Sequence, residues 1–181
     1  MRALIYIIDT IASLITLLLL LRFWLPWVGA DFRNPMAQGI LQVTSPLINP
    51  LRRVIPAIGR IDTATVLLAL VVQVIAVTIV LLLVGAPLSV RFVLVSAIFE
   101  LVKLSLLMFT FAIIIRIVLS WVAPGTYNPA TALIANLTDP VLRPFRRFIP
   151  PIGGFDVSPI FAIILLGALS ILVEDSRALF L

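Results

Sequence analysis

Four long runs of apolar residues constrain this chain more than any other feature of its sequence. They cover roughly residues 3–28, 63–84, 92–122 and 157–173, and a helix of about 20 residues is enough to cross the hydrocarbon core of a bilayer. Hydrophobic residues make up 62% of the 181 and charged residues only 12%, so the chain has too little polar surface to fold mainly against water. The runs predict an all-α membrane protein with four transmembrane helices.

An internal repeat is the second constraint. A shift of 94 residues aligns residues 22–62 with residues 116–156 without a gap, and 17 of the 41 aligned pairs are identical. Each unit holds two spans, so both copies enter the membrane from the same side and form parallel, not inverted, repeats. We expect two tandem hairpins of transmembrane helices, in residues 1–90 and 91–181.

Each predicted hairpin contains a linker with helical signals of its own, in residues 34–61 and 128–155. Both linkers begin with Asn-Pro, an N-cap followed by a proline at the first helical position. Pro46 and Pro140 should interrupt or restart the helix, because a later proline removes a hydrogen bond and clashes with the preceding turn. We therefore expect a short amphipathic helix on the membrane surface, followed by an irregular piece. The apolar positions of this helix recur at helical spacing in both linkers. They are Met36, Ile40, Val43 and Leu47 in the first linker and Ala130, Ile134, Leu137 and Val141 in the second.

Arginine is concentrated in these linkers. Seven arginines lie in or beside them, whereas the other ends of the spans carry single arginines at Arg2, Arg91 and Arg177. Short basic loops stay in the cytoplasm, so the linkers are predicted to be cytoplasmic and both termini periplasmic. The net charge of +5 is explained by basic residues that set the topology or contact anionic lipid. We therefore expect no nucleic-acid partner.

Two arginine pairs, Arg52–Arg53 and Arg146–Arg147, are the most specific polar signal. They stand in Leu-Arg-Arg-Val-Ile-Pro and Phe-Arg-Arg-Phe-Ile-Pro, where apolar side chains could enter the acyl region while the guanidinium groups reach phosphates. The pairs could bind an anionic phospholipid or a membrane-protein partner. The simpler alternative is that they only set topology.

Four more charged residues lie at the ends of the spans. Arg22 and Arg116 are inside apolar runs, where an unpaired arginine costs at least about 2.5–3.5 kcal/mol. Asp62 and Asp156 begin the following spans at a similar depth. We expect Arg22–Asp62 and Arg116–Asp156 ion pairs, within one copy or exchanged between copies, which would either clamp the hairpins or line a polar path for ions.

Asp9 and Lys103 occupy equivalent positions under the 94-residue shift. Parallel repeats place equivalent positions at equal depth, so an ion pair between the first and third spans is expected. Glu100 lies one turn from Lys103 and could compete for it. Such a pair would lock helices together or, alternatively, serve transport.

The chain contains no cysteine and no histidine. Disulfides, Fe–S clusters and histidine ligands are therefore excluded, and the sequence has no glycine-rich phosphate loop and no serine nucleophile with a base. We expect no enzymatic activity, no metal and no cofactor.

The pattern Thr-x-Pro-x-x-x-Pro-x-Arg-Arg-x-Ile-Pro-x-Ile-Gly-x-x-Asp occurs at residues 44–62 and 138–156. It resembles the signature of the YggT family of bacterial inner-membrane proteins, over nearly the whole chain and in the two-copy form of proteobacterial members. The resemblance implies an inner (cytoplasmic) membrane location but no agreed activity. Proteobacterial members are linked to osmotic tolerance and potassium uptake, YlmG-type members to the neighbourhood of division genes, and plastid members to cytochrome-complex assembly and nucleoid distribution.

This range of roles favours a non-enzymatic organiser or assembly factor that binds anionic lipid or a membrane partner through its two interfacial segments. The alternative is an accessory protein or channel for ion (potassium) uptake under osmotic stress. The two segments differ at Asn49/Arg143 and Arg60/Gly154, so they need not bind the same ligand. Small bundles in lipid also gain from packing against further copies, which makes a homo-oligomer a further expectation.

Overall fold

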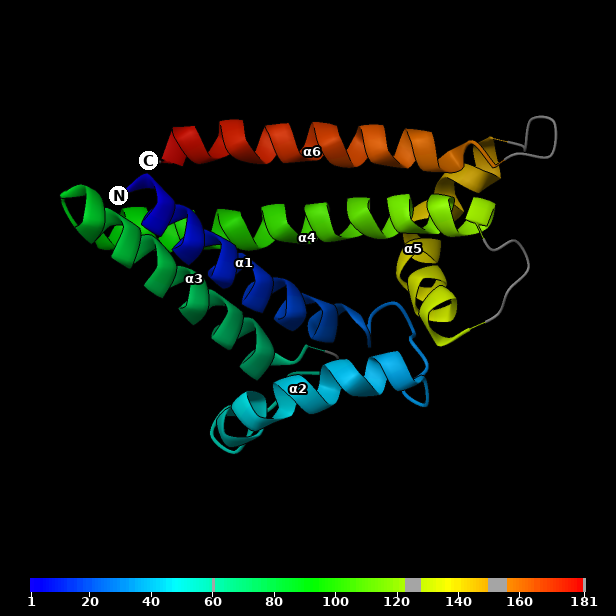
Figure 1. Ribbon diagram of the computed structural model, residues 1–181, viewed down its shortest axis with the longest axis horizontal. Coiled ribbons are helices and arrows are strands. Elements are labelled where there is room, and N and C mark those ends of the chain that lie inside the picture. Colours follow the sequence, from blue (N-terminus) through cyan, green and yellow to red (C-terminus); the bar gives the residue numbers. More distant parts are fainter. Residues whose placement is uncertain (60, 123–127, 150–155, 181) are drawn as a thin grey trace.

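The chain folds into helices joined by short connections (Figure 1). The computed structural model describes residues 1–59, 61–122, 128–149 and 156–180. Within these ranges it contains six α-helices and no β-strand. The helices are α1 Arg2–Trp24, α2 Pro35–Arg52, α3 Thr63–Val84, α4 Val90–Val122, α5 Pro129–Phe148 and α6 Ser158–Phe180.

Helices α1, α3, α4 and α6 are long and apolar enough to cross a membrane, with mean hydropathies of 2.4, 3.1, 2.3 and 1.8. This confirms the four predicted spans and the all-α class. The first helix ends at Trp24, earlier than predicted, because Pro26 has no N–H to continue it and Gly29 adopts a left-handed φ of 68°. With 33 residues, α4 is about 50 Å long and exceeds the hydrocarbon thickness.

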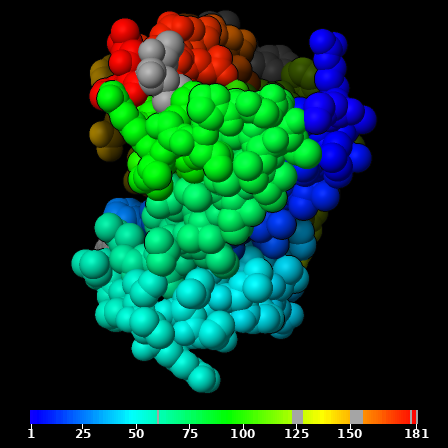
Figure 2. All heavy atoms as spheres, turned by 90° about the vertical axis from the view of Figure 1, so that its left-hand side faces the viewer, coloured from blue at the N-terminus to red at the C-terminus, as the bar shows by residue number. Residues whose placement is uncertain are grey.

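The four spans form a bundle with two distinct ends. Helix α1 packs along α3 and α4 packs along α6, while α4 also contacts α1 and α3. Both termini and the turn between α3 and α4 lie at one end, the terminal end, and α2 and α5 lie at the other, the linker end (Figure 1). Figure 2 faces the terminal end and shows the α3–α4 turn, in green, between α1 and α6.

The linker helices belong to the packed core. One cluster of buried residues joins α1, α2 and α3 through Leu19, Ile48 and Ala64. Another places Leu142 of α5 among residues of α1, α4 and α6, and a third joins the two linker helices through Ala37 and other residues. Small residues such as Ala64, which is fully buried, let helices approach closely in lipid. The linker helices are therefore held against the ends of the spans.

The predicted N-caps of both linker helices are confirmed. The Asn34 side chain accepts a hydrogen bond of 2.8 Å from the backbone N–H of Met36, and Asn128 accepts one of 2.9 Å from Thr131. The Asn34 amide also donates to the carbonyl of Pro129 at 2.7 Å, so the first residues of α2 and α5 are linked directly.

The predicted break at the internal prolines is wrong. Helix α2 continues through Pro46 and Pro50, and α5 continues through Pro140 and Pro144. A proline leaves one carbonyl of the preceding turn without its usual donor, but α2 packs against α1 and α3, and α5 packs against α4 and α6, which offsets this loss. The irregular chain begins only after Arg52 and Phe148. Both arginine pairs thus stand at helix C-termini, where the helix dipole favours positive charge.

The predicted apolar stripe has a different environment in the two linker helices. In α2, Met36, Val43 and Leu47 are all exposed. In α5, Leu137 is 2% exposed because it packs against Leu25, Ala30 and Ala37, at the end of α1 and the start of α2. Only α2 presents its stripe outward. Arg60 and the part of the second interfacial segment in residues 150–155 lie outside the described residues.

Candidate functional site

Arg22 fastens the first span to the first linker helix. It lies in the last turn of α1 and is 4% exposed. Its Nη1 donates to Oγ1 of Thr44 at 2.6 Å, to Oγ of Ser45 at 3.2 Å and to the carbonyl of Leu41 at 3.2 Å. All three acceptors belong to one turn of α2, so the guanidinium fixes where α2 crosses the end of α1.

Arg116 does the same for the second linker helix. Its Nη1 donates to Oγ1 of Thr138 at 2.6 Å, to Oδ1 of Asp139 at 2.6 Å and to the carbonyl of Ala135 at 3.5 Å. Each acceptor stands 94 residues after its counterpart around Arg22. We call these two sets of contacts the arginine–threonine clamps.

The threonine partners were not predicted from the sequence. Carboxylates were the expected partners of Arg22 and Arg116 because they carry the opposite charge. Thr44 and Thr138 are identical across the repeat, and their position within a motif of prolines and arginines was the available signal.

Asp62 lies between two arginines. Its Oδ2 is 3.6 Å from Nε of Arg22, an ion pair within the first copy, and 2.6 Å from Nη2 of Arg52. A second bond from Nε of Arg52 to Oδ1, at 3.2 Å, makes the contact with Arg52 bidentate, and the hydroxyl of Thr65 also donates to Asp62. Arg52 is therefore the stronger partner. Nε of Arg22 is buried without a hydrogen-bond acceptor among the described residues.

These contacts shift the pKa of both groups. Burial alone would raise the pKa of Asp62, but the hydrogen bonds from Arg52 and Thr65 and the charges of Arg52 and Arg22 outweigh it, so the pKa falls below its ordinary value. The hydrogen bond to Asp62 raises the pKa of Arg52. Both groups are thus held in their charged forms at neutral pH.

The predicted Arg116–Asp156 pair is wrong. Arg116 pairs with Asp139 at 2.6 Å, and Asp156 pairs with Arg146 at 2.8 Å. Asp139 occupies the position that Ser45 has in the first copy, directly after the clamp threonine, so its carboxylate reaches Arg116 first. Arg146 also contacts Asp139 at 3.1 Å, which joins four alternating charges into one chain.

The two carboxylates among these four charges, those of Asp139 and Asp156, have pKa values below the ordinary value for aspartate. Burial opposes ionisation of Asp139, but hydrogen bonds and charge from Arg116 and Arg146 lower its pKa. Burial likewise opposes ionisation of Asp156, and hydrogen bonds from Ser158 and Arg146 lower its pKa.

The structure divides each predicted arginine pair into two roles. Arg52 and Arg146 are held by Asp62 and Asp156. Their neighbours Arg53 and Arg147, together with Arg143, are exposed and form no ion pair within the described part of the chain. We call these three residues, which lie at the C-terminal ends of α2 and α5, the free arginines. Arg33, in the turn before α2, is also exposed and forms no ion pair with a described residue.

Two large apolar side chains stand beside the free arginines. Val54 follows Arg53 and is 80% exposed, and Phe148 follows Arg147 and is 85% exposed. In the second copy an open hollow of about 270 Å³ is lined by Arg143, Arg147 and the Asp139–Arg146 pair. Guanidinium groups present paired donors that match phosphate oxygens. The linker end thus places exposed guanidinium groups next to exposed apolar side chains.

The predicted Asp9–Lys103 pair is also wrong. Lys103 Nζ lies 2.6 Å from Oε1 of Glu174 on α6, because α6 runs alongside α4 whereas α1 crosses it obliquely (Figure 1). The equivalent positions of Asp9 and Lys103 in the repeat therefore do not place their side chains in contact. Glu100 does not take the lysine either, and Asp9 and Glu100 both line a cavity at the terminal end.

Four apolar spans with a charged linker end define the chain as a multi-pass α-helical membrane protein. The family model described as CCB3/YggT matches residues 1–83 and again residues 95–176. The chain belongs to the CCB3/YggT family.

The relatives extend this likeness over the full length. The chain is 44% identical over 178 residues to the uncharacterized protein PA0392 of Pseudomonas aeruginosa, covering 97% of this chain and 90% of that protein. It is 37% identical over 175 residues to the uncharacterized protein YggT of Escherichia coli, covering 97% and 91%. A shorter match, 44% over 59 residues, links it to the chloroplastic YlmG homolog protein 2 of Arabidopsis thaliana and covers 31% and 22%. No solved structure matches the chain.

Proposed function

We propose that the protein is a non-enzymatic membrane organiser that binds anionic phospholipid headgroups through the free arginines at its linker end. The observation that carries the proposal is that Arg53, Arg143 and Arg147 form no ion pair with any described residue, and that Arg53 and Arg147 stand beside the exposed Val54 and Phe148. In this proposal the linker end faces the cytoplasm of a bacterial inner membrane and both termini face the periplasm.

The division of each pair supports lipid binding over a purely topological role. Topology depends on the number of basic residues in a loop and requires no particular partner for any of them. Here Asp62 and Asp156 each take one arginine and leave the next one directed outward. An arginine near an anionic membrane surface contributes about 1 kcal/mol, so three contribute about 3 kcal/mol, roughly a hundredfold in affinity.

The exposed stripe of α2 supports an organising role. Met36, Val43 and Leu47 form an outward-facing row on a helix whose other side is fixed to α1 by the first clamp. Such a row can enter the acyl boundary or cover a membrane-protein partner, while lipid bound at the free arginines sets the height of the helix.

Lipid retention tests the proposal. The full-length protein would be purified in mild detergent and mixed with vesicles of phosphatidylglycerol and phosphatidylcholine, and bound lipid would be measured by native mass spectrometry. We expect the triple variant Arg53→Gln/Arg143→Gln/Arg147→Gln to lose at least tenfold in phosphatidylglycerol binding. The control Arg2→Gln/Arg91→Gln removes arginines of the terminal end and should bind as the unmodified protein does.

Topology is read separately because the chain has no cysteine. Single cysteines at Ser89→Cys, in the turn before α4, and Gln38→Cys, on α2, would be labelled from either side of the membrane. Unchanged lipid binding by the triple variant would refute the headgroup site. If that variant also inverted the labelling pattern, the arginines would be topological signals alone.

Ion uptake, the alternative role, predicts a different result. The arginines expected to line a polar path, Arg22 and Arg116, are instead engaged by α2 and α5. We therefore expect proteoliposomes to show no potassium flux above that of empty vesicles. A flux that Arg116→Gln abolishes would favour the alternative.

A further inference from the structure

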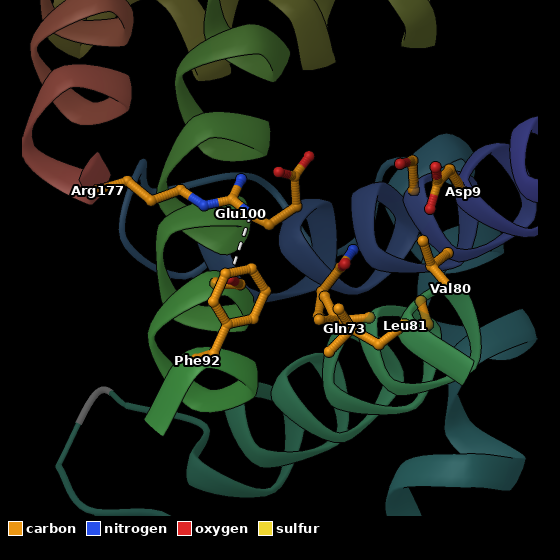
Figure 3. Close-up of a pocket in the computed structure, with 11 residues that line it drawn as sticks. Asp9, Gln73, Val80, Leu81, Phe92, Glu100 and Arg177 are labelled. Carbon is orange, nitrogen blue, oxygen red and sulfur yellow. Dashed lines mark hydrogen bonds between the residues drawn. The ribbon is translucent and has the colours of Figure 1, made fainter. Parts of the chain in front are cut away.

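A polar cavity lies at the terminal end, where all four spans meet. Its volume is about 340 Å³. Helix α1 contributes Asp9 and Ser13, α3 contributes Gln73, α4 contributes Ser96 and Glu100, and α6 contributes Arg177 (Figure 3); apolar residues of α3 and α4 complete the wall. The cavity is at the opposite end of the bundle from the free arginines, so it does not depend on lipid binding there.

The charged groups that line this cavity form no close ion pair among the described residues. Across the described residues, Asp9 and Glu100 form no ion pair within 4.0 Å and accept no side-chain hydrogen bond. Arg177 likewise forms no ion pair. An unpaired charge within a span costs several kcal/mol unless water or a partner reaches it. Asp9 is exposed and Glu100 and Arg177 are half-buried, so water reaches the cavity, and the charges of both signs around it suit a polar ligand.

Two buried polar side chains give the cavity a fixed wall. Ser96, which is 1% exposed, accepts a hydrogen bond of 3.1 Å from Nη2 of Arg177 and holds this guanidinium at the cavity edge. Gln73 is 3% exposed, and its amide nitrogen donates to Thr16 at 2.9 Å. No described residue donates to the amide oxygen of Gln73, which is one of the residues that line the cavity.

We propose that this cavity binds a small zwitterion of the α-amino-acid class. Figure 3 shows Arg177 on one side, Asp9 on the other, and Glu100 and Gln73 between them. The ligand ammonium group would lie between Asp9 and Glu100 and donate to Gln73, and its carboxylate would accept from Arg177. A simple cation offers nothing to Arg177, and a simple anion leaves two carboxylates unpaired, so a molecule with both charges fits best.

Titration calorimetry on the full-length protein in lipid nanodiscs tests this assignment. The probes are the twenty common α-amino acids, with putrescine as a purely cationic control and succinate as a purely anionic one. We expect at least one amino acid to bind with a Kd of about 1 mM or tighter, and both controls to bind at least tenfold more weakly. Asp9→Asn, Glu100→Gln and Arg177→Gln should each weaken amino-acid binding at least tenfold.

Two matched variants and one chemical probe keep the result interpretable. Asp175→Asn and Arg2→Gln remove exposed charges that do not line the cavity, and they should bind as the unmodified protein does. A thiol reagent should label Ser13→Cys, the bound amino acid should slow that labelling, and this readout leaves every charge in place. No binding by any amino acid, equal binding of putrescine or succinate, or full binding by the charge variants would overturn the proposal.

Discussion

The guanidinium of Arg22 donates a 2.6 Å hydrogen bond to the hydroxyl of Thr44. That hydroxyl in turn donates to the carbonyl of Ile40 at 2.6 Å, so the threonine is locked in the orientation that receives the arginine. The pair joins a membrane span to a helix that lies across its end. Arg116 and Thr138 form the same contact at the same distance.

The clamp predicts that Thr44→Val is destabilising. Valine keeps the shape of threonine but leaves the buried Arg22 short of an acceptor, which costs about 1–3 kcal/mol. Thermal unfolding in detergent should show a lower midpoint for Thr44→Val and a nearly unchanged midpoint for Thr44→Ser. Thr138→Val should have a smaller effect, because the Arg116 side chain is 26% exposed and that of Arg22 only 3%. Equal losses at the two threonines would contradict this account.

The first copy has Ser45 at the position where the second copy has Asp139. This difference predicts that an aspartate at residue 45 can restore stability lost at Asp62. Asp62→Asn removes the charged partner of Arg22 and Arg52. Because the Arg52 side chain is 45% exposed, the change should cost about 1–3 kcal/mol. Adding Ser45→Asp places a carboxylate where Asp139 serves Arg116, so the double variant should recover part of the loss. Unfolding midpoints of the two single variants and the double variant measure the coupling. Strict additivity would show that the carboxylate at residue 45 does not reach Arg22.

Acid should weaken the linker end. The folded pKa of Asp62 is below its ordinary value of about 3.9, so its contribution to stability is complete above that value and is lost as the pH falls through the folded pKa. The pKa values of Asp139 and Asp156 are also lowered, so acid should weaken their contributions to stability in the same way. These contributions should be smaller than that of Asp62, because the two side chains are 48% and 40% exposed.

The measurement is the unfolding midpoint in detergent between pH 7 and pH 3. It should be flat near neutrality and fall below about pH 4. Asp62→Asn should start lower and fall less steeply. A loss of stability between pH 5 and pH 7 would point to a different titrating group.

The Lys103–Glu174 pair predicts that one substitution is worse than two. The two side chains are 41% and 57% exposed on helices that cross the membrane. Lys103→Met leaves a lone carboxylate toward lipid, whereas Lys103→Met/Glu174→Gln leaves none. The amount of folded protein recovered from membranes, read by size-exclusion chromatography, should be lowest for Lys103→Met. Equal recovery of both variants would show that the pair is not coupled.

The spans and the N-caps could be predicted from the sequence because they depend on local signals. About twenty apolar residues specify a span, and Asn34 before Pro35 specifies a helix start. The prediction failed at the internal prolines, because the penalty that breaks a helix in isolation is offset by packing against the spans. Tertiary contacts, such as those of Leu142, hold α5 together through Pro140 and Pro144.

Charge pairing was the least predictable part. Arg116 has two candidate aspartates in sequence, and the choice between them depends on a single residue after Thr138. Lys103 pairs with Glu174 because α6 lies beside α4. The 94-residue register of the repeat does not indicate which helix is the neighbour of α4. The unpaired state of Arg53 and Arg147 could not be read from the motif, in which the two arginines of each pair look alike.

The ion-paired groups in the two halves of the linker end differ in net charge. In the first, Arg22 and Arg52 share one carboxylate, Asp62, so one positive charge is left over. In the second, Arg116 and Arg146 meet Asp139 and Asp156 and the sum is zero. The free arginines offset this difference, because Arg53 adds one positive charge to the first half and Arg143 and Arg147 add two to the second. The surplus charge of the first half therefore lies within an ion-pair network and that of the second lies at the surface, so an anionic neighbour in the plane of the membrane meets more accessible guanidinium groups on the second half.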